Sequence, residues 1–146
     1  MKNLVSNTLK AFSAWAVLGI SCLCAQSGHI LIANVPFDFS VVNQHFGAGA
    51  YTVSTDVSSS VILIRGNEDG SARFALTTAA QTTKVQEHAK LVFNRYGDHY
   101  FLTQVWNAGS DLGRKLQPSK AEQEMARNMG KPEVIALLAS APKPQR

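Results

Sequence analysis

The 146-residue sequence predicts a mainly β protein, an antiparallel β-sandwich or a partly closed barrel with a short C-terminal helical segment. Three observations predict this fold class. Segments that alternate apolar with polar or small residues recur through the middle of the chain, as half-buried strands do. Glycine-containing turns separate these segments. After residue 116 the pattern changes to a helix-capping sequence followed by apolar residues at helical spacing.

The first half of the β region contains four predicted strands. Residues 35–41 and 51–54 alternate at period two, and residues 29–33 are expected to form a separate short strand. Pro36 cannot donate a ladder hydrogen bond, so we expect it at a strand start or a sheet edge. The compact β-branched run at 61–64 is expected to be buried on both sides.

The second half of the β region contains a strand and a hairpin. The strand at 74–78 follows a turn at 66–70. The hairpin joins residues 90–96 to residues 99–106 through a short connection in which Gly97 is the natural residue for a positive φ. Strands joined by such turns are typical of sandwiches and barrels.

The C-terminal part predicts two short helices. Ser119 and Glu122 have the spacing of a capping box, which marks a helix start. We expect the two helices to dock on the sheet or on an unknown protein or envelope partner. The apolar face of the first helix consists of Ala121, Met125 and Met129, and that of the second, which begins at Pro132, of Val134, Leu137, Leu138 and Ala141.

The N-terminal segment has the composition of a secretory signal. Lys2 and Lys10 precede an apolar run over 11–20, and small residues close the segment. The run is shorter than the roughly 20 apolar residues of a membrane span. We therefore expect residues 1–25 to be a signal peptide. The mature chain is then exported, periplasmic or extracellular, and has no transmembrane span.

Both cysteines, Cys22 and Cys24, lie in the expected signal peptide. The mature chain then has no thiol, which excludes disulfides, thiol catalysis and cysteine-based zinc sites. The alternative is a lipid anchor at Cys22, although the leucine usual three positions earlier is replaced by Gly19. The resulting division is a signal peptide at 1–25, a β domain at 26–116, C-terminal helices at 117–141 and a disordered tail at 142–146.

The charge of the chain argues against a nucleic-acid partner. The formal net charge is +4, from 14 basic and 10 acidic residues, and removal of Lys2 and Lys10 leaves 12 basic residues and a net charge of +2. The remaining basic residues are mixed with acidic ones. Nucleic-acid binding requires a dense basic patch, so we expect none.

Two blocks of the sequence share a pattern with known proteins. The first is VPFDFSV at 35–41 with AGAYTV at 48–53. The second is FNRYGDHYFL at 93–102, followed by Val105, Trp106, Gly109, Gly113, Arg114, Leu116, Ser119 and Glu122. Together they resemble a group of small exported bacterial β-rich proteins without an assigned activity. The resemblance covers most of residues 35–124 and implies export and a β-rich fold. It supplies no catalytic residue, and Gly47 stands where that group tends to have proline.

Catalytic residues cannot be assigned from the sequence. The histidines are not spaced as metal ligands usually are, the serine run at 58–60 is not a nucleophile elbow, and no phosphate-binding loop occurs. We therefore expect no metal and no cofactor. An enzyme should bring at least two polar candidates within hydrogen-bond reach inside a cleft. These candidates are His45, His88, His99, Asp38, Asp98 and Glu87.

The aromatic hairpin supplies the candidate binding surface. The favoured interpretation is that Phe93, Phe101 and Trp106 belong to the core, because buried aromatics dominate β-sandwich packing. In this interpretation the arginine of the hairpin stacks on or pairs with a neighbour. The alternative is a ligand-binding surface made by Arg95, Tyr96, Tyr100 and Trp106.

The sequence therefore predicts a non-enzymatic exported module that acts by binding or assembly. Two alternatives remain open. One is a small secreted hydrolase that acts on carbohydrate or peptide. The other is a small barrel that binds an apolar ligand, which requires an open interior.

Overall fold

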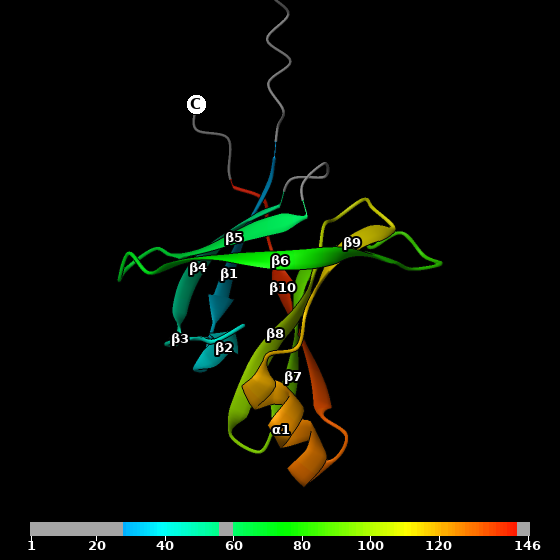
Figure 1. Cartoon of the computed structure of the whole chain (residues 1–146). Coiled ribbons are helices and arrows are strands. Elements are labelled where there is room, and N and C mark those ends of the chain that lie inside the picture. Colours follow the sequence, from blue (N-terminus) through cyan, green and yellow to red (C-terminus); the bar gives the residue numbers. More distant parts are fainter. Residues whose placement is uncertain (1–27, 56–59, 143–146) are drawn as a thin grey trace, which may run out of the picture.

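The computed structural model describes residues 28–55 and 60–142, and in these residues the chain forms one mixed, mostly antiparallel sheet of ten strands with one short helix (Figure 1). This confirms the predicted fold class. The expected signal peptide, with both cysteines, and the end of the chain from residue 143 lie outside the described residues. The elements are β1 (His29–Val35), β2 (Phe39–Val41), β3 (Gln44–Phe46), β4 (Gly49–Thr55), β5 (Val61–Gly66), β6 (Ala72–Gln81), β7 (Ala89–Tyr96), β8 (His99–Trp106), β9 (Leu112–Leu116), α1 (Lys120–Met129) and β10 (Glu133–Ala139).

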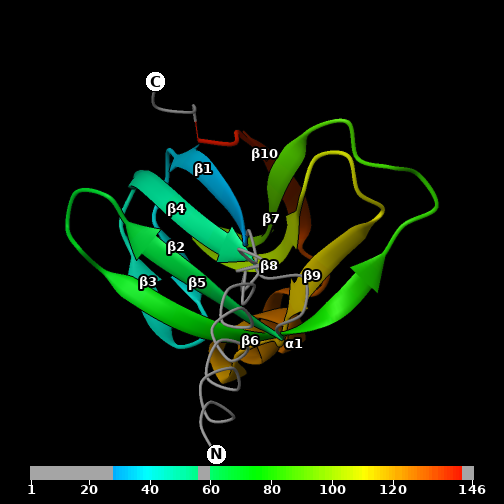
Figure 2. The same cartoon turned by 90° about the horizontal axis from the view of Figure 1, so that it is seen from above.

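The sheet curls until its two ends meet. The pairing order β1-β4-β5-β6-β9-β8-β7-β10 places β1 and β10 at the ends. A single bridge joins Ile32 of β1 to Ser140, with backbone hydrogen bonds of 2.7 and 2.9 Å. Because only this bridge connects the ends in the described residues, the sheet is formally open, and the nearer of the two predicted architectures is the partly closed barrel (Figure 2).

The β2–β3 hairpin lies beside the half of β8 that β9 does not cover. β9 pairs with β8 at Gln104–Trp106, whereas β2 pairs with it in parallel at Ser40 and Phe101. The hairpin sends Phe39 and Phe46 into the interior, where Phe39 stacks on Phe46 and packs edge-on against Phe93, each at 5.4 Å between ring centroids. Side chains therefore fill the barrel at this end.

Two strand predictions were wrong in detail. Residues 35–41 are divided between the end of β1 and β2, because Pro36 has no amide proton to donate to a ladder and the chain bends at Phe37. The Phe37 ring stacks on Tyr100 with ring centroids 3.9 Å apart. Within residues 61–64, Ile62 and Ile64 are buried, while Val61 and Leu63 lie on the partly exposed outer face. The strand is thus half-buried, as a barrel wall requires, rather than buried on both sides.

The predicted second helix was also wrong, because residues 133–139 form strand β10. β10 pairs with β7 over seven residue pairs, from Glu133–Arg95 to Ala139–Ala89. The apolar residues of this segment are compatible with a helix or with a strand. Pairing with β7, whose edge would otherwise have unpaired backbone groups, favours the strand. The β domain therefore continues to β10 instead of ending at residue 116.

Helix α1 begins as predicted but packs with a different face. The Ser119 hydroxyl accepts the Glu122 amide at 3.1 Å, as in a capping box. Ala121 and Met129 are exposed, whereas Glu122 is buried and accepts a hydrogen bond of 2.9 Å from the Asn94 side chain of β7. Burial raises the pKa of Glu122, and this effect is opposed by the Asn94 hydrogen bond and by the charge of Lys115.

Candidate binding surface

The four residues of the predicted binding surface lie on two faces of the β7–β8 hairpin. Arg95 and Tyr100 are cross-strand partners on the inner face. Tyr96 and Trp106 lie on the outer face, where they are only 5% and 7% exposed. Trp106 packs against the backbone of β9 at Gly113, and its indole N–H donates to Gln104. The structure therefore brings two of the four residues together and buries the other two.

A β-bulge in β8 causes this separation. Leu102 pairs with Phe93 and Gln104 with Val92, so Thr103 has no partner of its own in the ladder. Its hydroxyl donates to the Val92 carbonyl at 3.0 Å. An extra residue inverts the alternation of side chains along the strand. Tyr100 and Trp106, which period two would place on one face, therefore point to opposite faces.

Neighbouring groups hold the Arg95 guanidinium. Its Nε donates to the Gly97 carbonyl at 2.8 Å, its Nη1 lies 3.3 Å from Glu133 Oε2, and its Cζ lies 5.4 Å from the centroid of the Tyr100 ring. The positive φ of Gly97, 61°, lets the turn present that carbonyl. A hollow of about 360 Å³ beside it is lined by Arg95, Tyr96, Gly97, Met129, Lys131 and Glu133.

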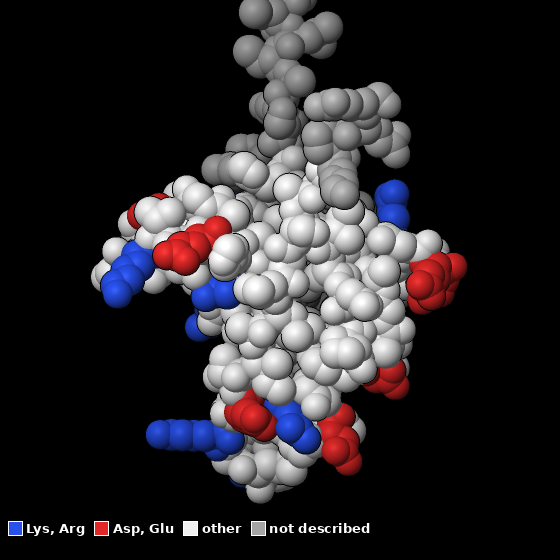
Figure 3. Space-filling model, turned by 180° about the vertical axis from the view of Figure 1, so that it is seen from behind, with Lys and Arg blue, Asp and Glu red and all other residues white. Residues whose placement is uncertain are grey.

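A different surface carries exposed apolar side chains. On β10, Val134 and Leu138 point outward and are 65% and 68% exposed. Ile30 of β1 is also exposed, and the bridge between Ile32 and Ser140 places it on the same outer face. We call Ile30, Val134 and Leu138 the rear face. Seen from behind, the centre of the molecule is uncharged and the charged residues lie around its margin (Figure 3).

A second apolar patch lies on the outer face of β5 and β6. Phe74 and Leu76 are exposed and pair across the strands with Leu63 and Val61. The sequence predicts a strand at 74–78 but does not indicate which of its faces is exposed. The alternation in the sequence could have indicated this exposed face, because the small Ala75, which is buried, lies between the large residues Phe74 and Leu76, which are exposed.

The polar candidates for catalysis do not meet the requirement for an enzyme in the described residues. His45 Nε2 lies 3.8 Å from Asp38 Oδ2, beyond hydrogen-bond distance, and the His45 side chain is 69% exposed. Glu87 and His88 line a hollow of about 350 Å³ beside His29, but no group of three metal-ligating side chains occurs in the part of the chain that the structure describes.

Comparisons of this chain with known protein families, with curated proteins and with solved structures find no match. In residues 28–55 and 60–142, no helix has the length and apolar character needed to cross a membrane.

Proposed function

We propose that this chain is an exported, non-enzymatic module that acts by binding or assembly at the cell envelope or outside the cell. The rear face is the observation that supports the proposal. Val134 and Leu138 expose about two-thirds of their surface on a strand where side chains alternate, and Ala136 lies between them on that face. Their cross-strand neighbours on β7 are Asn94 and Lys90, so Lys90 borders the apolar surface at Leu138. Contiguous exposed apolar surface of this kind commonly marks a site of protein interaction.

The side chains of the rear face on β10 project from a rigid backbone, which favours binding to another folded protein. This strand is held by seven pairs with β7, so the side chains project from a rigid support. Ordering such side chains against a partner costs less than ordering a loop, because their backbone is already fixed. The partner we propose is therefore a protein with an apolar patch of its own.

The two alternatives have weaker support. A hydrolase would need converging polar groups in a cleft, whereas His45 and Asp38 are exposed on a hairpin. A carrier of a sizeable apolar ligand would need an open interior, whereas the interior is occupied by the aromatic rings of Phe39, Phe46 and Phe93.

Site-specific photo-crosslinking in the producing cell tests the proposed surface. A photoreactive residue at Leu138 should give one discrete crosslinked product, and Val134→Lys should abolish it, because a charge on the rear face opposes apolar contact. The matched control is a photoreactive residue at Thr78, which is exposed on the outer face of β6 but polar, and it should give no discrete product. Equal products from both faces, or none from Leu138, would contradict the proposal.

The mass of the exported protein tests the proposed location. A mature chain that starts at Gln26 supports soluble export, and an acylated Cys22 supports an anchored form. Retention of Met1 on the functional protein would contradict export through a cleaved signal.

A further inference from the structure

One half of strand β6 has an edge that no other strand covers in the described residues. β6 spans Ala72–Gln81 and pairs with β5 through residues 72–76, whereas β9 pairs with its other edge through residues 77–81 alone. Figure 1 shows β9 beside only one half of the strand. We call residues 72–76 of β6, on the side away from β5, the open edge.

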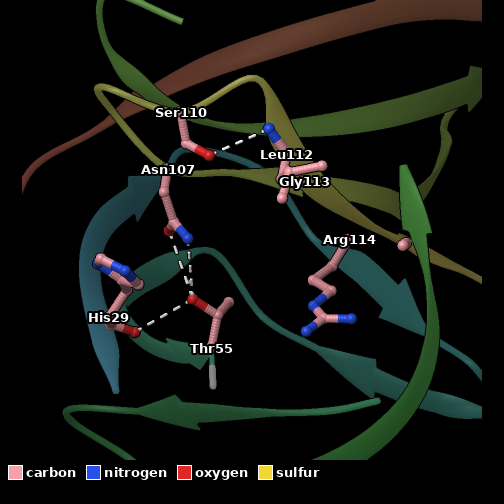
Figure 4. Close-up of a pocket in the computed structure, with 8 residues that line it drawn as sticks. His29, Thr55, Asn107, Ser110, Leu112, Gly113 and Arg114 are labelled. Carbon is pink, nitrogen blue, oxygen red and sulfur yellow. Dashed lines mark hydrogen bonds between the residues drawn. The ribbon is translucent and has the colours of Figure 1, made fainter. Parts of the chain in front are cut away.

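The other half of β6 is covered. Besides its pairing with β9, it contributes Ala79 to the lining of a cavity of about 130 Å³ at the mouth of the barrel. In this cavity the Asn107 amide donates to the Thr55 hydroxyl at 3.3 Å, and that hydroxyl donates to the His29 carbonyl at 3.3 Å (Figure 4). The open edge therefore ends at residue 76, and Thr78 lies outside it.

The backbone groups of the open edge are directed away from β5. The Thr77 amide donates to the Ser60 carbonyl at 2.7 Å, on the β5 side of the strand. Because backbone groups of successive residues alternate between the two sides of a strand, those of Ala72, Phe74 and Leu76 point to the open side. A row of such groups without a partner strand is a template on which another strand can pair.

The outward side chains of the open edge favour contact with a further strand. Phe74 and Leu76 are 69% and 70% exposed, and Ala72 lies on the same face. Side chains on neighbouring strands contact each other when they share a face of the sheet, and pairs of aromatic and β-branched residues are favourable. An added strand with apolar residues on its outer face would therefore cover exposed apolar surface at the same time as it pairs with the backbone.

Arg73 is the charged residue of the open edge. It pairs with Ile64, a core residue that is 1% exposed, so its side chain points to the inner face of the sheet. Its Nε is buried and has no hydrogen-bond partner among the described residues. A buried donor without an acceptor costs free energy, which a suitable acceptor recovers. A residue opposite Arg73 on an added strand would share its face, with the two β-carbons about 5 Å apart.

The charge of Arg73 determines which strand fits. A carboxylate opposite it accepts charge-assisted hydrogen bonds from the guanidinium. A second copy of this chain, paired through its own open edge, would bring two Arg73 side chains onto one face of the sheet, where like charges repel. An inward-pointing charge on an edge also disfavours strands without a matching group. The edge therefore suits an acidic segment and opposes self-association.

We propose that the open edge of β6 binds an extended acidic segment of another protein, which adds an antiparallel strand to the sheet. Both present neighbours of β6 are antiparallel to it. The segment places an acidic side chain against Arg73 and apolar side chains against Phe74 and Leu76, as in other cases of strand addition to a sheet edge. This contact is separate from the protein contact proposed for the rear face.

Titration of the isotope-labelled chain with a synthetic peptide, followed by amide NMR, tests the edge. The probe is the capped peptide SVTVEVS, whose glutamate faces Arg73 when its central valine faces Phe74. It should cause saturable shifts at Ala72, Phe74 and Leu76 with a Kd at or below about 1 mM. The peptide SVTVQVS, which lacks the charge, should bind about tenfold more weakly. Equal binding of the two peptides, or no saturation, would overturn the proposal.

Variants assign the charged contact. Arg73→Gln should remove the preference for the glutamate peptide over the glutamine peptide, and Arg73→Glu should shift the preference to SVTVKVS. Arg127→Gln, at an exposed arginine of α1, is the control and should leave the preference unchanged. A preference that persists in Arg73→Gln would overturn the role of this residue.

Modified peptides test strand pairing without any change in the protein. An N-methyl group on the valine opposite Phe74 removes an amide that faces the open edge, so it should abolish binding. The same group on the glutamate, whose amide faces away from the edge, is the matched control and should be tolerated. Equal effects of the two N-methyl groups would overturn pairing through the backbone.

Self-association is the competing use of the open edge. Dilution of the chain without peptide should leave the amide shifts of Ala72, Phe74 and Leu76 unchanged, because two copies of Arg73 repel each other. Concentration-dependent shifts confined to these residues would show that a second copy occupies the edge, and they would overturn the assignment of an acidic segment from another protein.

Discussion

The contact between Gly113 and Trp106 predicts a strong and testable coupling. A β-carbon added at Gly113 would lie 2.5 to 2.9 Å from three ring atoms of Trp106, whereas carbon atoms pack best at about 3.5–4.0 Å. Trp106 is buried, and its N–H donates to Gln104 at 2.9 Å, so the ring cannot move without disturbing that bond. Gly113→Ala should therefore destabilise the fold.

The expected size follows from two costs. Overpacking costs about 1–3 kcal/mol, and the strained hydrogen bond adds about 1 kcal/mol. The free energy of unfolding should thus fall by about 2–4 kcal/mol, which lowers Tm by about 8–16 °C for a domain of this size. Trp106→Ala alone should cost about 3–5 kcal/mol as a buried aromatic.

A double-mutant cycle measured by urea unfolding and far-ultraviolet circular dichroism checks the reasoning. In the Trp106→Ala background the added methyl group meets no ring, so Gly113→Ala should cost less than about 0.5 kcal/mol. Trp106→Leu replaces Trp106→Ala if the latter does not fold. Gly47→Ala is the control, because the nearest atom to its new β-carbon would be Asp38 Oδ1 at 3.9 Å, and it should be neutral. An additive cycle, or an unchanged Tm for Trp106→Ala, would refute the packing argument.

Two further predictions concern charged groups. Glu122→Gln keeps the acceptor for Asn94 and removes a buried charge. Because burial raises the pKa of Glu122 in the folded state, that state binds the proton of the carboxyl group more tightly than the unfolded chain does. The free energy of unfolding of the wild type should therefore fall as the pH rises above the ordinary pKa of 4.5. At pH 8 the variant should therefore unfold at a higher urea concentration than the wild type, and at pH 4 this difference in urea midpoint should be much smaller. Equal differences at both pH values would contradict burial of the charged carboxylate as the cause. Arg95→Ala should lower the free energy of unfolding by less than about 1 kcal/mol, because the Glu133 carboxylate that it pairs with is mostly exposed. Thermal unfolding measures this change. A loss of more than about 2 kcal/mol would contradict the prediction, because an exposed ion pair contributes less than that.

The strands were predictable where their pattern was local. Alternation in β4, the glycine turn between β7 and β8, and the serine cap of α1 depend on neighbouring residues, and each is found as expected. The apolar character of Val134 and Leu138 is also visible in the sequence, where both belong to the apolar face of the predicted second helix. Their secondary structure is not, because residues 133–139 satisfy the helical and the strand patterns equally well.

The candidate sites depended on contacts that the sequence does not encode locally. The bulge at Thr103 separates Trp106 from Tyr100, although their spacing places both on one side of a regular strand. The sequence does not indicate the cavity of about 130 Å³ at the mouth of the barrel, because its lining residues come from segments as far apart as His29 and Arg114. No short-range pattern links such residues.

The sequence by itself determined the β-rich class, the turns and the start of the helix, because hydrophobic alternation, glycine φ and capping act over a few residues. Only the tertiary structure decided which face of each strand is buried and that residues 133–139 complete the sheet. It also placed Arg114 among the residues that line the cavity at the mouth of the barrel. These features depend on pairing between distant strands, where an open edge or a single bulge outweighs local preference.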